Sequence, residues 1–317
     1  MQAKGQFKVI WDVRDIEEVL VDPTFPDSLK ARIKLIQEIK QFGVDSLGLT
    51  PSSNYTTFYD QHNKPLIWLI TASNRYEIEA YQWRFPIIGS FPYKGYFDST
   101  RAVMDEKVLK QLGYDTDIGE VSAWSTLGYL KDPILSSMLL KSEGSLANLI
   151  LHELTHGTVF VKSNLELNEN LASFIGNYGA ERFLVFKYGP DSEELKNYQF
   201  SKTYNEAYSQ HMVRGAKALD SLYQTFDGDQ QLNARKDSLK NEMILRIITK
   251  TDTLLGGKMA LLNRKNKLNI DLPNNAVFIS YKTYRSQQNN FKKDFDENYD
   301  GNFKLYLKGL KNTHTSP

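Results

Sequence analysis

The sequence contains no cysteine, and this absence removes several kinds of chemistry at once. Disulfides, thiolate ligands to a metal and a cysteine nucleophile are all excluded. A chain without thiols tolerates oxidising and reducing compartments equally well, so cysteine usage says nothing about location. The absence narrows the chemistry without placing the protein in a compartment.

An excess of one charge is also missing. Lys plus Arg total 39 and Asp plus Glu total 38, which gives a net charge of +1. Duplex DNA binders usually carry a basic excess, so we expect no nucleic-acid partner, although a local basic patch stays possible. No apolar run reaches the length of a membrane span, and the first residues, MQAKGQFKVIW, have no signal-peptide core.

What the chain does contain is typical of a globular protein with a substantial core. It has 317 residues, of which 41% are hydrophobic and 24% charged, enough for one large domain or two smaller ones. Apolar spacing predicts an amphipathic helix over 27–43, ended by Gly43, and another helix over 99–112. Strands are predicted at 56–60, 65–72 and 93–98 and, with its turn, at 117–128.

From residue 145 onward the pattern is mostly helical. We predict a helix capped by Ser145, a second from Asn168 to about Tyr188, and further helices at 192–227, 231–250 and 284–310. Residues 268–278 are predicted to be an irregular loop. The fold class is therefore α+β, with a mixed N-terminal part at 1–144 that holds the sheet and a helical part at 145–317, integrated into one unit.

The segment LILHELTHGTVF, residues 149–160, carries the clearest chemistry. On a helix, His152 and His156 lie one turn apart on the same face, where both imidazoles can reach one Zn²⁺. Glu153 lies about 100° around the helix from His152, so it can approach a metal-bound water without being a ligand. H-E-x-x-H thus provides two ligands and one general base.

A catalytic zinc normally takes three protein ligands, and the third must come from elsewhere. No third histidine follows closely, so a carboxylate is the better candidate. Glu169 is expected in the first turn of the second predicted helix, where a carboxylate is favourable even without a metal. Glu166 is a rival ligand, expected in the preceding loop.

The second helix offers an independent indication. Glu169 shares a face with the mostly small residues Ala172, Ser173, Gly176 and Ala180. Such a face lets two helices approach closely, which would bring Glu169 to the two histidines. The plainer interpretation is a chance H-E-x-x-H match with a hydrogen-bonded core histidine and a favourable first-turn charge.

These residues carry a resemblance to a known family. The stretch LILHELTHGTVFVKSNLELNENLASFIGNYGAERFL resembles the HELxH…VK…NE-x-x-A core of the bacterial putative aminopeptidase family. FPIIGSFPYKGYFD (85–98), AWSTLGYLKDPILSSM (123–138) and NNAVFISYKTY (274–284) resemble three further blocks of that family. The resemblance extends over roughly residues 3–310.

The resemblance implies a zincin-like fold and a gluzincin-like metallopeptidase. One Zn²⁺ would be held by His152, His156 and Glu169, with Glu153 as the base that takes a proton from the metal-bound water and passes it to the leaving amine. Members usually begin with a lipoprotein signal or hydrophobic anchor. We therefore expect a cell-envelope protein whose leader was removed, touching the membrane only through that anchor, and a cytoplasmic protein if no leader was removed.

Further site residues are expected around this centre. Tyr284 matches the family's NNA…Y spacing and is a candidate transition-state donor, or a packed helical tyrosine; Tyr96 and His211 are weaker candidates. Ser173, one turn after Glu169, could orient a ligand.

If strand 117–128 pairs with an extended peptide, its end would line the cleft through Ser125, Thr126 and Gly128. Asn274 and Asn275 could reach the site or satisfy their own loop.

Three functions compete at this point. The first is a zinc-dependent peptidase acting on a peptide or protein substrate, an aminopeptidase by family name, although no residues that would capture a free α-amine are evident. The second is a non-catalytic zincin-fold envelope protein that binds peptides or partner proteins. The third is a metal-free helical domain with a chance motif. An intact Glu153 favours the enzyme over the binding protein.

Overall fold

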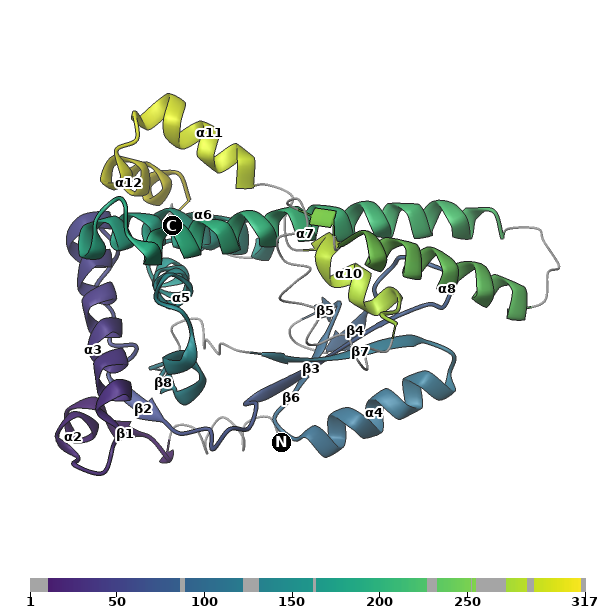
Figure 1. The fold of residues 1–317 in the computed structure, drawn as a ribbon, viewed down its shortest axis with the longest axis horizontal. Helices are drawn as coiled ribbons and strands as arrows, with labels where there is room; N and C mark the ends of the chain where they lie inside the picture. The colour runs from purple at the N-terminus through teal and green to yellow at the C-terminus, as the bar shows by residue number, and fades with distance from the viewer. Residues whose placement is uncertain are drawn as a thin grey trace. The chain divides into compact units, whose positions relative to one another are not determined.

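Helices and small sheets are mixed along the chain, which confirms the α+β fold class (Figure 1). The computed structural model describes residues 11–85, 89–121, 131–161, 164–226, 233–251, 253–254, 272–283 and 288–314. The chain divides into two compact units: Met1–Leu66, Val121–Gln199 and Tyr284–Pro317 form unit 1, and Ile67–Glu120 and Phe200–Thr283 form unit 2. The boundary expected at residue 144 falls inside unit 1.

None of the described helices has the length and the apolar composition that crossing a bilayer requires.

Unit 1 consists of helices with one small sheet. Strands β1 (Arg14–Asp15), β2 (Thr57–Tyr59) and β8 (Ile134–Leu135) form this sheet, in which β2 runs antiparallel to β1 and parallel to β8. The helical elements are α2 (Ile16–Val21), α3 (Asp27–Phe42), η1 (Gly43–Leu47), η2 (Ser136–Leu140), α5 (Glu143–His156), α6 (Leu165–Tyr188), α11 (Gln288–Tyr299) and α12 (Phe303–His314).

Helix α3 buries the apolar stripe that the sequence predicted, with Ile33, Ile36 and Ile39 fully buried. The α-helix ends at Phe42 with Gly43 as its C-cap, as the sequence predicted, but Gly43 keeps right-handed helical dihedral angles. The chain therefore continues through the π-helical turn η1 and stops at Gly48, whose φ of 77° lies in the left-handed region that glycine adopts without strain. Gly43 also provides room for α5, because a Cβ there would lie 2.9 Å from Leu151 Cδ2.

Helices α5 and α6 both begin before their predicted starts. Ser142, not Ser145, caps α5 and accepts a hydrogen bond from the Ser145 N–H at 3.4 Å. Asn164 caps α6 and accepts from the Leu167 N–H at 3.1 Å. Asn168, the predicted start, is buried and bonds both the N–H and the carbonyl of Val161. Glu169 therefore lies in the second turn of α6 rather than the first.

The C-terminal segment of unit 1 differs from the single helix predicted over 284–310. Its described part contains two helices, α11 and α12, separated at Asp300 and Gly301. Both residues have positive φ, 47° and 68°, and a helix cannot continue through that conformation. Phe295, Phe303 and Tyr306 then pack the two helices on α6 around Phe174 and Tyr178.

Unit 2 combines a three-stranded sheet, ordered β6-β3-β7, with a short hairpin and helices. Figure 1 shows α4 and α10 on opposite sides of this sheet, and both contact β3. The elements are β3 (Ile67–Ser73), β4 (Trp83–Phe85), β5 (Gly89–Phe91), β6 (Lys94–Tyr96), α4 (Ser99–Gln111), β7 (Asp115–Val121), α8 (Asn233–Lys250) and α10 (Asn275–Thr283). Helix α7 (Glu193–Gln224) contains the boundary between the units.

The predicted loop 268–278 is in part a helix. Its described residues enter α10 at Asn275, and the Asn274 side chain accepts a hydrogen bond from the Ala276 N–H at 3.0 Å. Two asparagines in a row suggested turn chemistry, but asparagine is also a preferred residue at a helix start. Phe278 and Ile279 of α10 then join Leu219 and Ile244 in a buried core.

Candidate metal centre

Helix α5 places His152 and His156 one turn apart with their rings facing each other. The ring centroids are 5.0 Å apart, and the two Nε2 atoms are 3.3 Å apart. The His152 side chain is 18% exposed and that of His156 is 6% exposed. Both imidazoles thus point the same nitrogen into one small, largely buried space.

Helix α6 brings Glu169 to this space. Its Oε2 lies 3.4 Å from Nε2 of His152, and its Oε1 lies 3.5 Å from Nε2 of His156. Each of the three side chains offers one ligand atom, and these atoms lie within 4.8 Å of one another. The structure therefore brings together the three residues that the sequence singled out as metal ligands.

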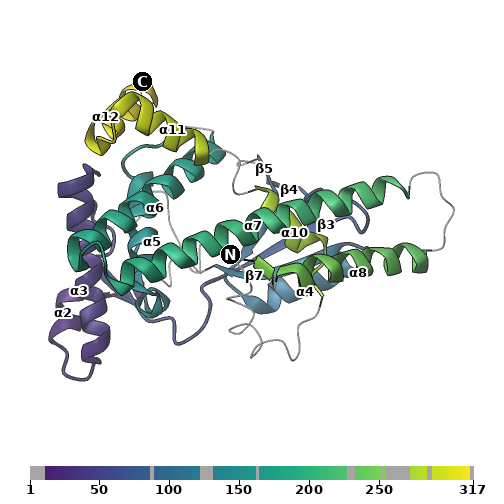
Figure 2. The ribbon, with the colours of Figure 1, turned by 45° about the horizontal axis from the view of Figure 1, so that its top comes forward.

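Glu169 reaches the histidines because α6 crosses α5 at close range, as its small face predicted. Gly176 lies at the crossing, where a Cβ would meet the Asn148 carbonyl oxygen at 2.9 Å and the His152 Cβ at 3.2 Å. Ala172 and Ala180, one turn before and one turn after Gly176, are fully buried. The views of Figures 1 and 2 agree in placing the two helices side by side.

The electrostatics of the cluster favour the protonation states that bind cations. Burial lowers the pKa of His156 to about 4, helped by the nearby His152 and opposed by Glu169. Burial alone would raise the pKa of Glu169, but the hydrogen bond from His152 and the charges of the two histidines lower it on balance. At neutral pH the cluster offers a neutral His156 and an ionised Glu169, as metal binding requires.

The spacing of the donors fits a tetrahedral divalent cation. Zinc bonds of about 2.0–2.2 Å to nitrogen and oxygen give tetrahedral ligand–ligand edges of roughly 3.3–3.6 Å. The separation of the two Nε2 atoms and the two contacts with Glu169 fall in this range, although the contacts use different carboxylate oxygens. Two imidazoles and one carboxylate are a donor set suited to zinc, so the residues present fit this ion.

Comparison with known proteins places the chain in a family. The model of a family described as "Putative aminopeptidase" matches residues 1–317. The chain belongs to this family. No curated protein and no solved structure matches it. Membership of this family supports a peptidase, and a peptide substrate is consistent with the family description.

Two further predicted residues lie close to the cluster in the chain. Glu153 follows His152 on α5 and is partly buried, and Ser173 lies one turn after Glu169 on α6, also partly buried. Glu166 lies in the first turn of α6 and not in the expected loop. Tyr284, Ser125, Thr126 and Gly128 lie outside the described residues, so their predicted roles stay predictions.

The remaining candidates belong to unit 2 and have structural contacts there. Asn275 is fully buried, donates to the carbonyls of Asn74, Arg75 and Glu77 at 3.0–3.1 Å, and accepts from the Tyr223 hydroxyl at 2.7 Å. These bonds use every hydrogen-bonding group of its amide in holding the fold. The other three candidates also form hydrogen bonds within unit 2: Asn274 with the Thr116 carbonyl, Tyr96 with Asp105, and His211 with the Ile247 carbonyl.

One polar network beside the cluster was not predicted. Asn148, one turn before His152 on α5, donates to Asn177 of α6 at 3.0 Å and to the Tyr198 hydroxyl at 2.9 Å. That hydroxyl donates in turn to Asn177 at 3.1 Å. The network fixes the crossing at Gly176, and the only hint in the sequence was the position of Asn148 on the face of the histidines.

Tyr55 was also missed. Its φ of 62° is unusual for a bulky residue, and this backbone is held by hydrogen bonds from its N–H to the Asp132 carbonyl (2.7 Å) and from Gln37 to its own carbonyl (2.8 Å). The side chain is fully buried, and burial together with the charges of Glu153 and Asp132 raises the pKa of its hydroxyl. Tyr55 thus lies within electrostatic range of Glu153, and nothing in its local sequence indicates this.

Proposed function

We propose that the protein is a zinc-dependent peptidase of the zincin-like, gluzincin type. The observation that carries the proposal is the convergence of His152, His156 and Glu169 from two helices at tetrahedral spacing. Family membership supports peptide hydrolysis, and the cluster supplies a donor set for the metal that such chemistry uses. One Zn²⁺ per chain is proposed.

Each residue has a distinct task in this proposal. His152, His156 and Glu169 would hold the ion, which when bound would supply Lewis-acid polarisation of the scissile carbonyl and a more acidic water. Glu153 follows a ligand directly, so its carboxylate can accept a proton beside the centre and deliver it to the leaving amine. Tyr284 remains our candidate for the donor that stabilises the developing oxyanion.

The test begins with metal analysis of the purified protein. We expect about one zinc per chain in the wild type and none in His156→Ala, because two ligands hold zinc far less tightly than three. His62→Asn is the matched control, since His62 is an 81% exposed histidine far along the chain from the cluster. Absence of zinc from the wild type after supplying it at neutral pH would remove the basis for an enzyme of this class.

A second candidate function is a non-catalytic protein that keeps the metal and binds peptides. Glu153 decides between the two, because a binding protein has no need of a base beside its metal. We expect Glu153→Gln to retain zinc and to lose hydrolysis of a peptide library that the wild type cleaves. A wild type that binds zinc and cleaves no member of the library would favour the binding protein.

A further inference from the structure

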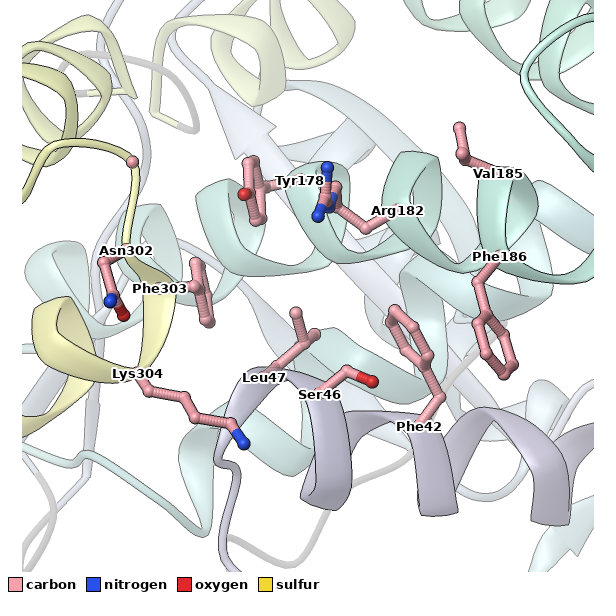
Figure 3. A pocket seen from close by; sticks show the side chains of 11 residues that line it. Phe42, Ser46, Leu47, Tyr178, Arg182, Val185, Phe186, Asn302, Phe303 and Lys304 are labelled. Carbon is pink, nitrogen blue, oxygen red and sulfur yellow. The ribbon is translucent and has the colours of Figure 1, made fainter.

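A hollow in unit 1 lies away from the metal centre (Figure 3). It has a volume of about 500 Å³, within the range of small-ligand sites. We call it the α6 pocket. It is lined by residues of α3, η1, α6, α12 and the turn before α12: Phe42, Ser46, Leu47, Tyr178, Arg182, Val185, Phe186, Gly301, Asn302, Phe303 and Lys304.

The pocket lies on the opposite side of α6 from Glu169. Tyr178 follows Glu169 by nine residues, which at about 100° per residue places it roughly 180° around the helix. Arg182 follows one turn later on the same side. A ligand in the α6 pocket would therefore touch neither Glu169 nor the histidines of α5.

Two cations at this pocket lack an acidic partner within the described part of the chain. Arg182 and Lys304 are both exposed and line the pocket from different helices. The Lys304 stem packs over Gly48 at the end of η1, where a Cβ would lie 3.3 Å from Lys304 Cγ. Figure 3 shows Arg182 beside Tyr178, with Lys304 extending from α12 toward η1. Two unpaired cations at one hollow favour an anionic ligand.

Aromatic rings form the walls between these charges. Tyr178 stacks on Phe303 with centroids 5.0 Å apart, and Phe42 packs beside Phe186 at 5.3 Å (Figure 3). Phe186 is 73% exposed, an unusual fraction for a phenylalanine beside a pocket. An apolar group seated between the two ring pairs would remove this ring face from water.

Polar groups in the same lining decide which anion fits. The Ser46 hydroxyl lines the pocket, and so does Asn302. The side-chain oxygen of Asn302 accepts from the Leu305 N–H at 3.2 Å, and among the described residues its amide NH₂ has no acceptor. A purely aliphatic acid would cover these groups without pairing them, which costs free energy. A peptide end offers a carboxylate, an apolar side chain and backbone groups that pair with both.

We propose that the α6 pocket binds the carboxylate end of a short peptide whose last side chain is apolar. Arg182 and Lys304 provide the positive charge that attracts the carboxylate, the two ring pairs receive the side chain, and Ser46 and Asn302 pair with the peptide backbone. The site is separate from the proposed catalytic centre, so it stands whether or not the chain hydrolyses peptides.

Titration of the ¹⁵N-labelled full chain with N-acetyl-Ala-Phe, followed by amide chemical shifts, tests the proposal. We expect the amide signals of Ser46, Leu47, Asn302 and Lys304 to shift until the site is saturated. A peptide bound at the metal centre would leave these four chemical shifts unchanged. N-acetyl-Ala-Phe-amide, identical but uncharged, should bind at least about tenfold more weakly. Equal binding of acid and amide, or tighter binding of decanoate than of the peptide, would overturn the proposal.

Variants then separate the pocket from general charge effects. Arg182→Gln and Lys304→Gln should each weaken binding of the acid by about 3- to 10-fold, since an ion pair at an exposed site contributes modestly. Lys34→Gln is the matched control, an exposed lysine of α3 outside the lining, and should leave affinity unchanged. Neither pocket variant should change the zinc content. An affinity that all three variants leave intact contradicts the assignment.

Discussion

Gly176→Ala tests the crossing of α5 and α6, on which the proposed metal centre depends. Alanine in a helix interior is normally about 1 kcal/mol more favourable than glycine. Here the added methyl would lie 2.9 Å from the Asn148 carbonyl oxygen, which is backbone and cannot rotate away. Overpacking of this kind costs about 1–3 kcal/mol, so after the gain in helix propensity we expect a net loss of up to about 2 kcal/mol in the free energy of unfolding.

The affinity for the metal should fall together with the stability. Relief of the clash moves α6 away from α5, which withdraws Glu169 from His152 and His156. We expect zinc affinity, measured by competition with a chromophoric chelator, to fall at least about tenfold, as loss of a ligand's support typically causes. Urea unfolding supplies the stability in parallel.

Gly179→Ala is the matched control for this prediction. It makes the same substitution three residues further along α6, but its Cβ would meet the methyl ends of Leu151 and Leu47 at 2.7 and 2.8 Å. Side-chain ends can rotate, so we expect a stability loss without a comparable loss of zinc affinity. The reasoning is refuted if Gly176→Ala binds zinc as the wild type does, or if both variants weaken zinc equally.

Three further predictions concern groups around and beyond the site. Tyr198→Phe removes the hydroxyl shared by Asn148 and Asn177, and should lower the free energy of unfolding by about 1 kcal/mol in urea titrations. Asn275→Ala removes a fully buried amide together with its hydrogen bonds, and should cost about 2–4 kcal/mol while zinc content, measured by elemental analysis, stays unchanged. Hydrogen bonds from Lys94 and Tyr96 lower the pKa of Asp105 below its ordinary 3.8. The ionised carboxylate therefore stabilises the fold fully above that pH, and this stabilisation is lost as the pH falls through the pKa of the folded state. The stability difference between wild type and Asp105→Asn should shrink over that acidic window, and a constant difference would contradict the assignment.

The helical part of the fold was largely predictable, but helix starts were not. Apolar periodicity in α3 and α5 reports burial directly, so those helices were found. Each start depends on which of several polar residues supplies the cap, and Ser142 and Asn164 were available in place of Ser145 and Asn168. Glu169 was still predicted to lie beside the two histidines because its face of α6 was chosen correctly, although its turn was not.

The supporting residues of the site were beyond sequence reasoning for a different reason. Tyr198 lies 50 residues from Asn148 in the chain, and Tyr55 lies further still from Glu153. Their proximity follows from how segments distant in the sequence pack together, which no local pattern encodes. Asn275 was expected either to reach the site or to satisfy its own loop, and its side chain instead bonds the turn that follows β3, which is distant in the sequence.

All three proposed ligands lie between residues 152 and 169, on two helices that follow each other in the chain. A cation held there closes only a short loop, and closing a short loop costs little chain entropy. It would therefore reinforce a local helical hairpin rather than fasten distant regions together. Removal of the metal should loosen α5 against α6 and leave unit 2 folded. A chelator would therefore weaken the packing of this helix pair without unfolding unit 2.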